Sequence, residues 1–333
     1  MDRYRVVHSG FSVGDMPPLE PDENMLRIQD RLTDDEYRHV ASLLAQRPDA
    51  WLHLCDRAPD VEHLVHFTGL RRVMVNNLRL ADWSGIRHVA ESLESLQMGD
   101  TTLKPISILP IGDLSNLTSL GLIGPVADAH VLDRLTGITE LSLRSVTLPD
   151  LGVVMPMTRL RSLYLGLGGT ADLGLLPGLR ALEKLELWRI RGLPDVSVLG
   201  SLPMVRSLSL QSMSAITSLP SFAGCGQLRR VALDTMKGIT DLRPVAAAPR
   251  LEELLLIAMP QLSPADLEPL VGHRSLRRGV WGLGSGRKNS AAYDLLPVGD
   301  PPYGHPKFDE WMARLAEQRA ADGVEALETS QHV

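Results

Sequence analysis

The chain has 333 residues, of which 44% are hydrophobic, so it is long enough for two ordinary domains and can bury a large core. Its formal net charge of -6 and its pI of about 5.9 argue against a nucleic-acid surface, which normally carries a basic stripe. Aromatic residues make up only 4% of the chain, which indicates a core built mainly from aliphatic side chains.

Two further features bear on the compartment. No apolar run approaches the roughly 18 residues that a membrane span needs, and the first residues, MDRYRVVHSG, lack the apolar region of a secretory signal. The two cysteines, Cys55 and Cys225, provide no disulfide framework. We therefore expect a cytoplasmic protein that binds neither membrane nor nucleic acid.

Residues 1–48 form the first predicted segment, an N-terminal extension. After the proline- and acid-rich stretch MPPLEPDEN comes TDDEYRHVASLLAQRP, where Thr33 and Glu36 fit a capping box and Pro48 ends the run. Three apolar side chains share one face of this stretch: Tyr37, Val40 and Leu44. The pattern predicts a helix of about a dozen residues that caps the segment that follows.

Residues 49–284 contain a nine-residue pattern, L-x-x-L-x-L-x-x-hydrophobic, that returns at intervals of 21 to 25 residues. The ten regular copies start at Leu70, Leu93, Leu117, Ile138, Leu160, Leu182, Val205, Leu228, Leu251 and Leu276. A degenerate eleventh copy precedes them in DAWLHLCDR, with Leu52 and Leu54 at two of the apolar places. Such regular spacing indicates a stack of repeated units.

The repeats, with the connecting phrase ITDLRPVAAAPRL, resemble the leucine-rich repeat family in its short bacterial form of about 22 residues, as in internalins. The resemblance implies an α/β solenoid, a leucine-rich repeat horseshoe. Its parallel β-sheet lies on the concave face, its convex side is mostly 3₁₀ or extended, and its terminal caps are helical. A single repeat cannot bury its own apolar side, so stacked neighbours share one core and the ends need caps.

The ninth place of the pattern departs from the family, which usually has an asparagine there. The column reads Leu78, Thr101, Pro125, Val146, Gly168, Ile190, Met213, Met236, Met259 and Gly284. The three methionines could suggest ligands for a soft metal, but core packing is favoured because methionine fills irregular gaps. The backbone in these turns must therefore find other hydrogen-bond partners.

Residues 285–333 form the last predicted segment. A loop-rich exit, GLGSGRKNSAAYDLLPVGDPPYGHP, leads into a helix and then into the final ETSQHV, which we expect to be disordered. Four apolar side chains form a short stripe on this helix: Phe308, Trp311, Met312 and Leu315. A capping helix is favoured over a docking helix for a partner.

Several residue groups could carry chemistry, and a structural role is favoured for each. His53 and Cys55 lie with Trp51 on one face of the degenerate repeat, where a Cys/His nucleophile is conceivable. The stretch Gly282–Lys288, GLGSGRK, superficially resembles a phosphate-binding loop but lacks its spacing, so a flexible exit is favoured.

Two other candidates are weaker still. His63 and His66 have the spacing of a metal pair but no third ligand in view. Cys225 occupies a place that other repeats fill with leucine, which predicts packing. We therefore predict no catalytic residue, no cofactor and no metal.

The open face of the sheet is the predicted partner site, because places three, five and seven of each copy project from it. Large aromatic residues and arginine are favoured at interfaces, and exposed apolar patches often mark contact surfaces. The partner-binding residues chosen on these grounds are Glu140, Arg144, Tyr164, Lys184, Glu186, Trp188, Gln211, Asp234, Leu255 and Ile257. The alternative interpretation is a solvated face with incidental aromatics.

These observations favour a non-enzymatic recognition or scaffold module that is monomeric in isolation and binds an unidentified protein on its concave face. A second hypothesis is a sensor or regulatory subunit of a larger assembly that docks through its terminal helices. A third is an enzyme or cofactor binder that uses Trp51, His53 and Cys55 or the GLGSGRK stretch.

Overall fold

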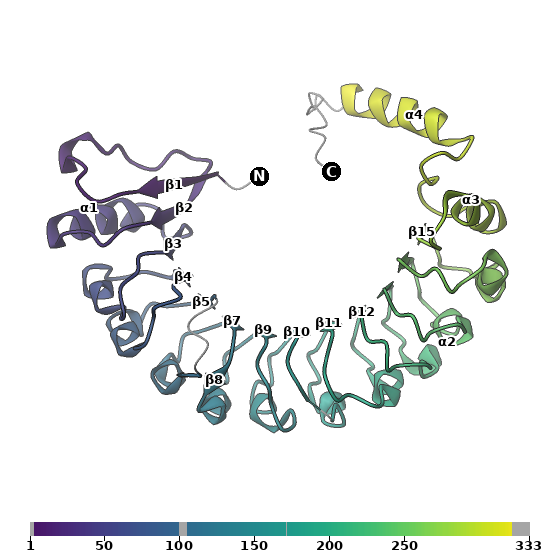
Figure 1. Ribbon diagram of the computed structural model, residues 1–333, viewed down its shortest axis with the longest axis horizontal. Coiled ribbons are helices and arrows are strands. Elements are labelled where there is room, and N and C mark those ends of the chain that lie inside the picture. Colours follow the sequence, from purple (N-terminus) through teal and green to yellow (C-terminus); the bar gives the residue numbers. More distant parts are fainter. Residues whose placement is uncertain (1–2, 100–104, 171, 322–333) are drawn as a thin grey trace. The chain divides into compact units, whose positions relative to one another are not determined.

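The computed structural model describes residues 3–99, 105–170 and 172–321 (Figure 1). The chain divides into two compact units, Met1–Val205 and Arg206–Val333, here called the N-terminal and the C-terminal unit. The predicted disorder of ETSQHV concerns residues outside the described part.

The N-terminal unit is built on a parallel sheet with strand order β1-β2-β3-β4-β5-β7-β9-β10-β11. The strands are Arg3–Val7, Glu23–Ile28, Trp51–Leu54, Arg72–Val75, Ser95–Met98, Ser119–Ile123, Glu140–Arg144, Ser162–Gly166 and Lys184–Trp188. In each repeat the sheet strand forms one side, and the other side is formed by short 3₁₀ turns or, after β2, by one α-helix, α1 (Asp34–Ala45) (Figure 1). The 3₁₀ turns are Val13–Asp15, Glu62–His66, Ser84–Val89, Leu109–Asp113, Ala129–Arg134, Gly152–Val154, Leu176–Gly178 and Ser197–Ser201.

The C-terminal unit continues the same construction. Its parallel strands are β12 (Ser207–Gln211), β13 (Arg230–Asp234), β14 (Glu253–Ile257) and β15 (Arg278–Trp281). Its other elements are the 3₁₀ turns Phe222–Gly224 and Pro264–Leu270 and the helices α2 (Arg243–Ala246), α3 (Gly286–Leu295) and α4 (Phe308–Ala321).

Each of the ten regular copies of the pattern produces one strand, and each of those strands begins at the third place of its copy. Neighbouring strands pair place for place: Ser162 opposes Lys184, and Leu163 opposes Leu185. The predicted fold class, a leucine-rich repeat solenoid with a parallel sheet, 3₁₀ turns and few helices, is confirmed.

The core consists of the leucines at places one, four and six. In the copy that forms β11, Leu182, Leu185 and Leu187 are at most 2% exposed. Burying one such side chain contributes about 1.5–3 kcal/mol, so the stacked leucine layers dominate the stability of each unit. Cys225 and the three column methionines Met213, Met236 and Met259 are also buried in this core. The packing role predicted for them is confirmed.

Helix α1 agrees with the prediction, including its capping box. The side chain of Thr33 accepts a hydrogen bond from Glu36 N, and Glu36 Oε2 accepts one from Thr33 N at 2.7 Å. The predicted inner face, Tyr37, Val40 and Leu44, is buried.

Strands β1 and β2 were not predicted, because residues 1–48 were interpreted as an extension with one helix. Both strands lack the leucine pattern, so its period could not reveal them. Val7, Leu26 and Ile28 nevertheless bury their side chains in the core. Arg5 on β1 also forms an ion pair with Glu23 on β2. Helix α1 therefore follows β2 and packs against the turn Glu62–His66 of the next repeat.

The missing asparagine column is replaced mainly by the backbone. At place eight the chain turns with positive φ, at Gly124, Ser145, Leu167 and Arg189 in the N-terminal unit and at Ser212, Thr235 and Ala258 in the C-terminal unit. This conformation lets the place-eight N–H donate to the place-seven carbonyl of the next strand, as in Leu167 N to Trp188 O at 2.9 Å. The turns are thus stacked by main-chain hydrogen bonds.

Two local devices complete the stacking. In the N-terminal unit, β6 (Ile106–Ser107) and β8 (Val126–Ala127) form a small parallel ladder, and parallel bridges also join Gly169 to Thr147 and to Arg191. In the C-terminal unit, Gln261 Nε2 donates to the carbonyls of Met236 and Ile239, both at 2.9 Å, and Met236 N lies 3.3 Å from Met259 Sδ.

The GLGSGRK stretch is not the flexible exit that the sequence suggested, because its second half begins helix α3. Ser285 caps this helix by accepting from Lys288 N. Lys288 Nζ donates to the carbonyls of Pro260 and Leu262 at 2.7 and 2.9 Å, so its ammonium is held by the preceding turn. Trp281 Nε1 in turn donates to Leu296 O at 3.3 Å.

Candidate functional site

The predicted partner-binding residues all lie on strands, at the outward places that the pattern assigned to them. Six belong to the N-terminal unit: Glu140 and Arg144 on β9, Tyr164 on β10, and Lys184, Glu186 and Trp188 on β11. Four belong to the C-terminal unit: Gln211 on β12, Asp234 on β13, and Leu255 and Ile257 on β14. Each side chain is exposed or half-buried, and each unit is described separately.

The centre of the N-terminal group is a stack of Arg144 on Trp188. The guanidinium carbon of Arg144 lies 5.2 Å from the centroid of the Trp188 ring, although β10 separates the two strands. Gly166 occupies the intervening position and pairs with Arg144 on one side and with Trp188 on the other. Because glycine has no side chain, the guanidinium can reach across β10 to the ring face, where the attraction is worth about 1 kcal/mol.

Tyr164 fills the space over the same glycine. A Cβ added to Gly166 would lie 2.5 Å from Tyr164 Oη, so the phenol ring leans over this position. Burial is the main cause that raises the pKa of Tyr164; the charge of Arg144 opposes this shift and that of Glu186 adds to it. Arg144, Tyr164 and Trp188 therefore form one contiguous cluster, here called the aromatic cluster, which includes Gly166 as its floor.

Acidic and basic side chains border the aromatic cluster. Lys184 Nζ lies 2.6 Å from Glu186 Oε1, so these two charges on β11 neutralise each other. Glu140 accepts from Ser119 Oγ at 3.3 Å on the neighbouring strand β7. Lys184 and Glu186 are thus one paired unit beside the cluster.

The residues of the C-terminal unit form two small groups. Gln211 Nε2 donates to Asp234 Oδ2 at 2.8 Å, so these two polar groups bind each other. Leu255 pairs with Val280 across β14 and β15, and Ile257 and Val280 are 41% and 49% exposed. The expected apolar patch of Leu255, Ile257 and Val280 is therefore present.

Gly166 is the residue of the aromatic cluster that the sequence analysis did not include among the predicted partner-binding residues. Partner-binding residues are expected among large and charged side chains, and a glycine offers no such chemistry. The sequence does contain a signal for it: at place seven of three successive copies, the residues are Arg144, Gly166 and Trp188, so a glycine stands between an arginine and a tryptophan.

His53 and Cys55 do contact each other, as their shared face predicted. Cys55 Sγ lies 3.1 Å and Asn76 Nδ2 lies 3.0 Å from the same atom, His53 Nε2. Burial, and then the charge of Arg27, lowers the pKa of His53 to about 4, while burial raises the pKa of the Cys55 thiol. Both groups are neutral near pH 7, which is the reverse of an activated thiolate beside an imidazolium.

His63 and His66 pack on Tyr37 rather than converging on a common point. Their rings stack on the phenol at centroid distances of 4.8 and 5.8 Å. His63 Nε2, Tyr37 Oη and Asp56 Oδ2 are buried and have no hydrogen-bond partner among the residues that the structure describes. Burial lowers the pKa of His63 to about 4 and raises that of Asp56 to about 6. In the described part of the chain, no three His, Cys, Asp or Glu side chains are grouped as metal ligands would be.

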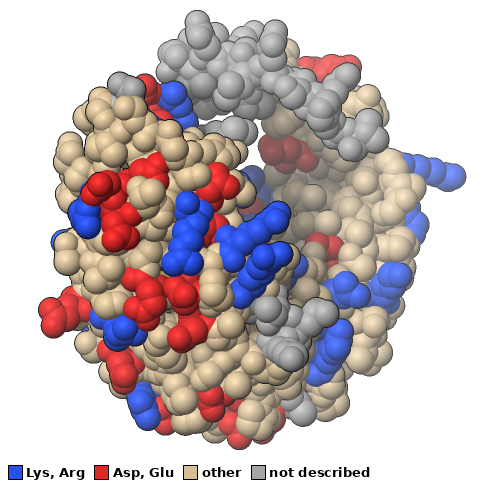
Figure 2. All heavy atoms as spheres, turned by 60° about the vertical axis from the view of Figure 1, so that its left-hand side comes forward, with Lys and Arg blue, Asp and Glu red and all other residues tan. Residues whose placement is uncertain are grey.

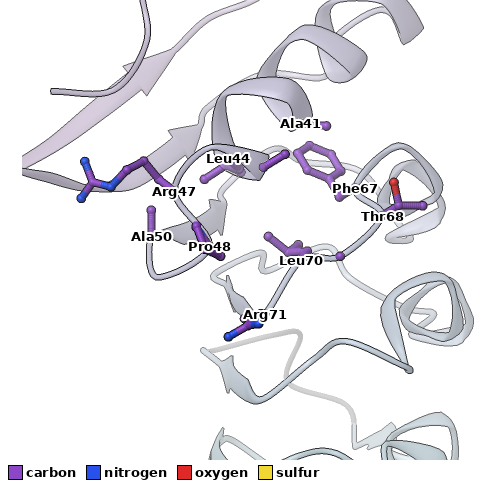
Figure 3. Close-up of a pocket in the computed structure, with 11 residues that line it drawn as sticks. Ala41, Leu44, Arg47, Pro48, Ala50, Phe67, Thr68, Leu70 and Arg71 are labelled. Carbon is purple, nitrogen blue, oxygen red and sulfur yellow. The ribbon is translucent and has the colours of Figure 1, made fainter. Parts of the chain in front are cut away.

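A small pocket lies between the end of α1 and the turn after Phe67 (Figure 3). Apolar atoms of Ala41, Leu44, Phe67 and Leu70 line it. At its rim, Arg47 is held by the carbonyl of Glu20, to which it donates at 2.8 Å, and its side chain extends away from the apolar lining (Figure 3). Thr68 and Arg71 also line the pocket, so it combines apolar contacts with polar groups at its edge.

Acidic and basic side chains are interspersed over the surface of the N-terminal unit that faces the viewer in Figure 2. Arg87 and His88, for instance, both contact the carboxylate of Glu62, at 2.9 and 3.0 Å. No helix within residues 3–99, 105–170 and 172–321 is both long and apolar enough to cross a membrane.

No protein-family model matches the chain, and no curated protein sequence matches it. Solved structures do. An internalin (inlF) from Listeria monocytogenes is 19% identical over 78% of this chain and 81% of that one, with a TM-score of 0.51. An internalin C2 (inlC2) from the same species is 25% identical over 56% of this chain and 80% of its own, with a TM-score of 0.43.

A Drosophila Toll–Spatzle complex is 15% identical over 88% of this chain and 45% of that chain, with a TM-score of 0.49. At 19% identity, the likeness to inlF concerns the fold. Together with the ten strands that begin at the third place of each copy, it shows that the chain has the fold of a leucine-rich repeat solenoid.

Proposed function

We propose that the chain is a non-enzymatic recognition module that binds a partner protein on the inner sheet face of its N-terminal unit, through the aromatic cluster. The observation that carries this proposal is the stack of Arg144 on Trp188 across Gly166. Tryptophan, tyrosine and arginine dominate the binding energy of protein interfaces, and here one of each meets at a single point.

The surroundings of the aromatic cluster suit such a role. Its side chains stand on β9, β10 and β11, whose backbones are fixed by parallel pairing on both sides of β10. A surface that is already ordered loses little conformational entropy on binding. The small side chains Ser142 and Ser162 flank Tyr164 and leave the ring accessible from the open side.

An enzymatic role for His53 and Cys55 is disfavoured by their charge states. A nucleophilic cysteine needs a lowered pKa, whereas burial raises that of Cys55 and leaves His53 neutral near pH 7. We therefore propose that these residues contribute to the inner surface as neutral polar groups.

Affinity capture from a native lysate of the source cells tests the proposal. The wild type, Trp188→Ala and Trp51→Ala serve as baits. Trp51 is the matched control because it is a half-buried tryptophan on the same sheet face, on β3. Proteins retained by the wild type and by Trp51→Ala should be depleted more than about tenfold on Trp188→Ala, as expected for an interface hot spot. Equal retention on all three baits would show that the binding site does not include the aromatic cluster.

A second candidate function is docking to a larger assembly through helix α4. The observation that favours it is Met312, which is 45% exposed next to the contact of Phe308 with Trp311. Capture with a Met312→Asp bait separates the two candidates. Under the second function this variant loses the partner and Trp188→Ala keeps it; under the first, the outcomes are reversed.

A further inference from the structure

The guanidinium of Arg144 has an aromatic partner but no acidic one. Within the described residues it forms no ion pair, and the interaction that fixes it is the stack on Trp188. Two other basic residues at outward places do have acidic partners: Lys184 pairs with Glu186 at 2.6 Å, and Arg230 pairs with Glu253 at 3.2 Å. Arg144 is therefore a free positive charge held in place on the proposed binding face.

Stacking leaves the hydrogen-bonding edge of a guanidinium available. The ring of Trp188 contacts the face of the planar group, whereas its N–H donors point outward along its edge. Tyr164 adds a hydroxyl beside the same glycine, and Tyr164 Oη has no hydrogen-bond partner in the described part of the chain. The guanidinium on β9 and the hydroxyl on the neighbouring strand β10 are thus two donors without an acceptor among the described residues.

We propose that this donor pair is the receptor for one carboxylate of the partner protein, an Asp or Glu side chain that lies beside an apolar residue contacting Trp188. Arg144 binds the carboxylate with two parallel N–H donors, which is the geometry that a guanidinium favours. The inference rests on the function proposed above and names the chemistry of its partner.

The local charge favours a carboxylate over a phosphate. On the outward places of β9, β10 and β11, Arg144 and Lys184 carry two positive charges, while Glu140 and Glu186 carry two negative ones. A single carboxylate is matched by the one unpaired guanidinium. A phosphate, with a charge of about -1.5 to -2 at pH 7, would also meet the two glutamates and would need further arginines.

Peptide selection tests the proposal with a defined probe. A phage-displayed library of random twelve-residue peptides is selected on the wild type after depletion on Trp188→Ala, so the retained clones depend on the aromatic cluster. Synthetic copies of these peptides, and copies in which each Asp or Glu is replaced by its amide, are then titrated against the wild type and Arg144→Gln. Arg161→Gln is the matched control, because Arg161 is an exposed arginine next to β10 and the substitution changes the charge equally.

We expect one acidic residue to recur in the selected peptides. Its amide copy should bind the wild type about tenfold to a hundredfold more weakly, as expected for a hydrogen bond to a charged group, and should bind Arg144→Gln no more weakly than the acidic copy does. Arg144→Lys should recover only part of the affinity, because an ammonium lacks the planar fork.

The outcomes separate this inference from the proposed function. Clones that depend on Trp188 but carry no recurrent acidic residue, or amide copies that lose affinity equally for the wild type and Arg144→Gln, overturn the carboxylate receptor and leave the recognition face intact. Failure to select any clone that depends on Trp188 overturns both.

Discussion

Arg144 on β9 contacts the ring of Trp188 on β11, at 5.2 Å from its centroid, across a strand that contributes only the glycine between them. Adjacent residues in a parallel sheet normally shield one another, so a contact between second neighbours depends on the middle residue being small. The proposed binding face therefore depends on Gly166 as much as on the two large side chains.

Replacing Gly166 by alanine should weaken partner binding more than it weakens the fold. The new methyl group would lie 2.5 Å from Tyr164 Oη, so the phenol must move off the strand and displace Arg144. We expect a loss of partner capture of about tenfold with a change of less than about 1 kcal/mol in the free energy of unfolding, measured by urea denaturation.

Gly121→Ala is the control for this substitution. Gly121 is also an outward glycine, on β7, and its added Cβ would meet the end of the flexible Gln97 side chain instead of a ring. Capture should be unchanged in this variant. Equal losses for both alanine variants would show that the effect comes from the sheet backbone and not from the aromatic cluster.

Asp56 and His63 should oppose each other in the pH dependence of stability. The pKa of Asp56 is raised to about 6, so its contribution is present at low pH and is lost as the pH rises through about 6. The pKa of His63 is lowered to about 4, so its contribution is present above its ordinary value of 6.5 and is lost as the pH falls toward 4. Each shift corresponds to roughly 3 kcal/mol, so the two nearly cancel.

Single substitutions remove this cancellation. In Asp56→Asn the free energy of unfolding should rise between pH 4.5 and pH 7 more steeply than in the wild type, because His63 and the similarly shifted His53 remain. In His63→Phe it should rise less or fall. Urea denaturation at several pH values measures both slopes. Parallel profiles for the three proteins would contradict the assignment of these shifts.

The strands of the repeats could be predicted because each copy of the pattern places leucines such as Leu182, Leu185 and Leu187 at fixed intervals, and stacking forces all copies into one register. Strands β1 and β2 could not be predicted in this way, since a single apolar residue such as Val7 or Leu26 carries no period. Helix α3 was missed for a related reason: its buried face is short, and Lys288 and Trp281 hold it through tertiary contacts.

For the binding face, the pattern predicted which side chains point outward but not which of them meet. That Arg144 lies over Trp188, while Lys184 turns to Glu186, depends on side-chain rotamers and on the space above Gly166. The contact of Arg144 with Trp188 joins strands that are not even neighbours in the sheet, so no local propensity encodes it.

Gln261 should be a stabilising residue of the C-terminal unit. Its amide satisfies the carbonyls of Met236 and Ile239 in the place of the missing asparagine. Gln261→Ala should lower the free energy of unfolding by about 1–3 kcal/mol, because it leaves these acceptors without a partner. Gln227→Ala, which removes a surface glutamine near Arg250, should change it by less than about 0.5 kcal/mol. Similar values for both variants in urea denaturation would contradict the role of Gln261.

Thr235 should be replaceable by glycine with a gain in stability. Its φ of 54° places a β-branched residue in the left-handed region, which costs about 1–3 kcal/mol. Glycine removes this strain but loses more backbone entropy on folding, so we expect a net rise of about 1 kcal/mol in the free energy of unfolding. Thr240→Gly is the control: Thr240 is exposed and has no positive φ, and its substitution should stabilise nothing. A loss of stability in Thr235→Gly, measured by urea denaturation, would contradict this expectation and would mean that the bond from Thr235 Oγ1 to Asp234 Oδ1 at 2.7 Å, which glycine cannot make, outweighs the strain.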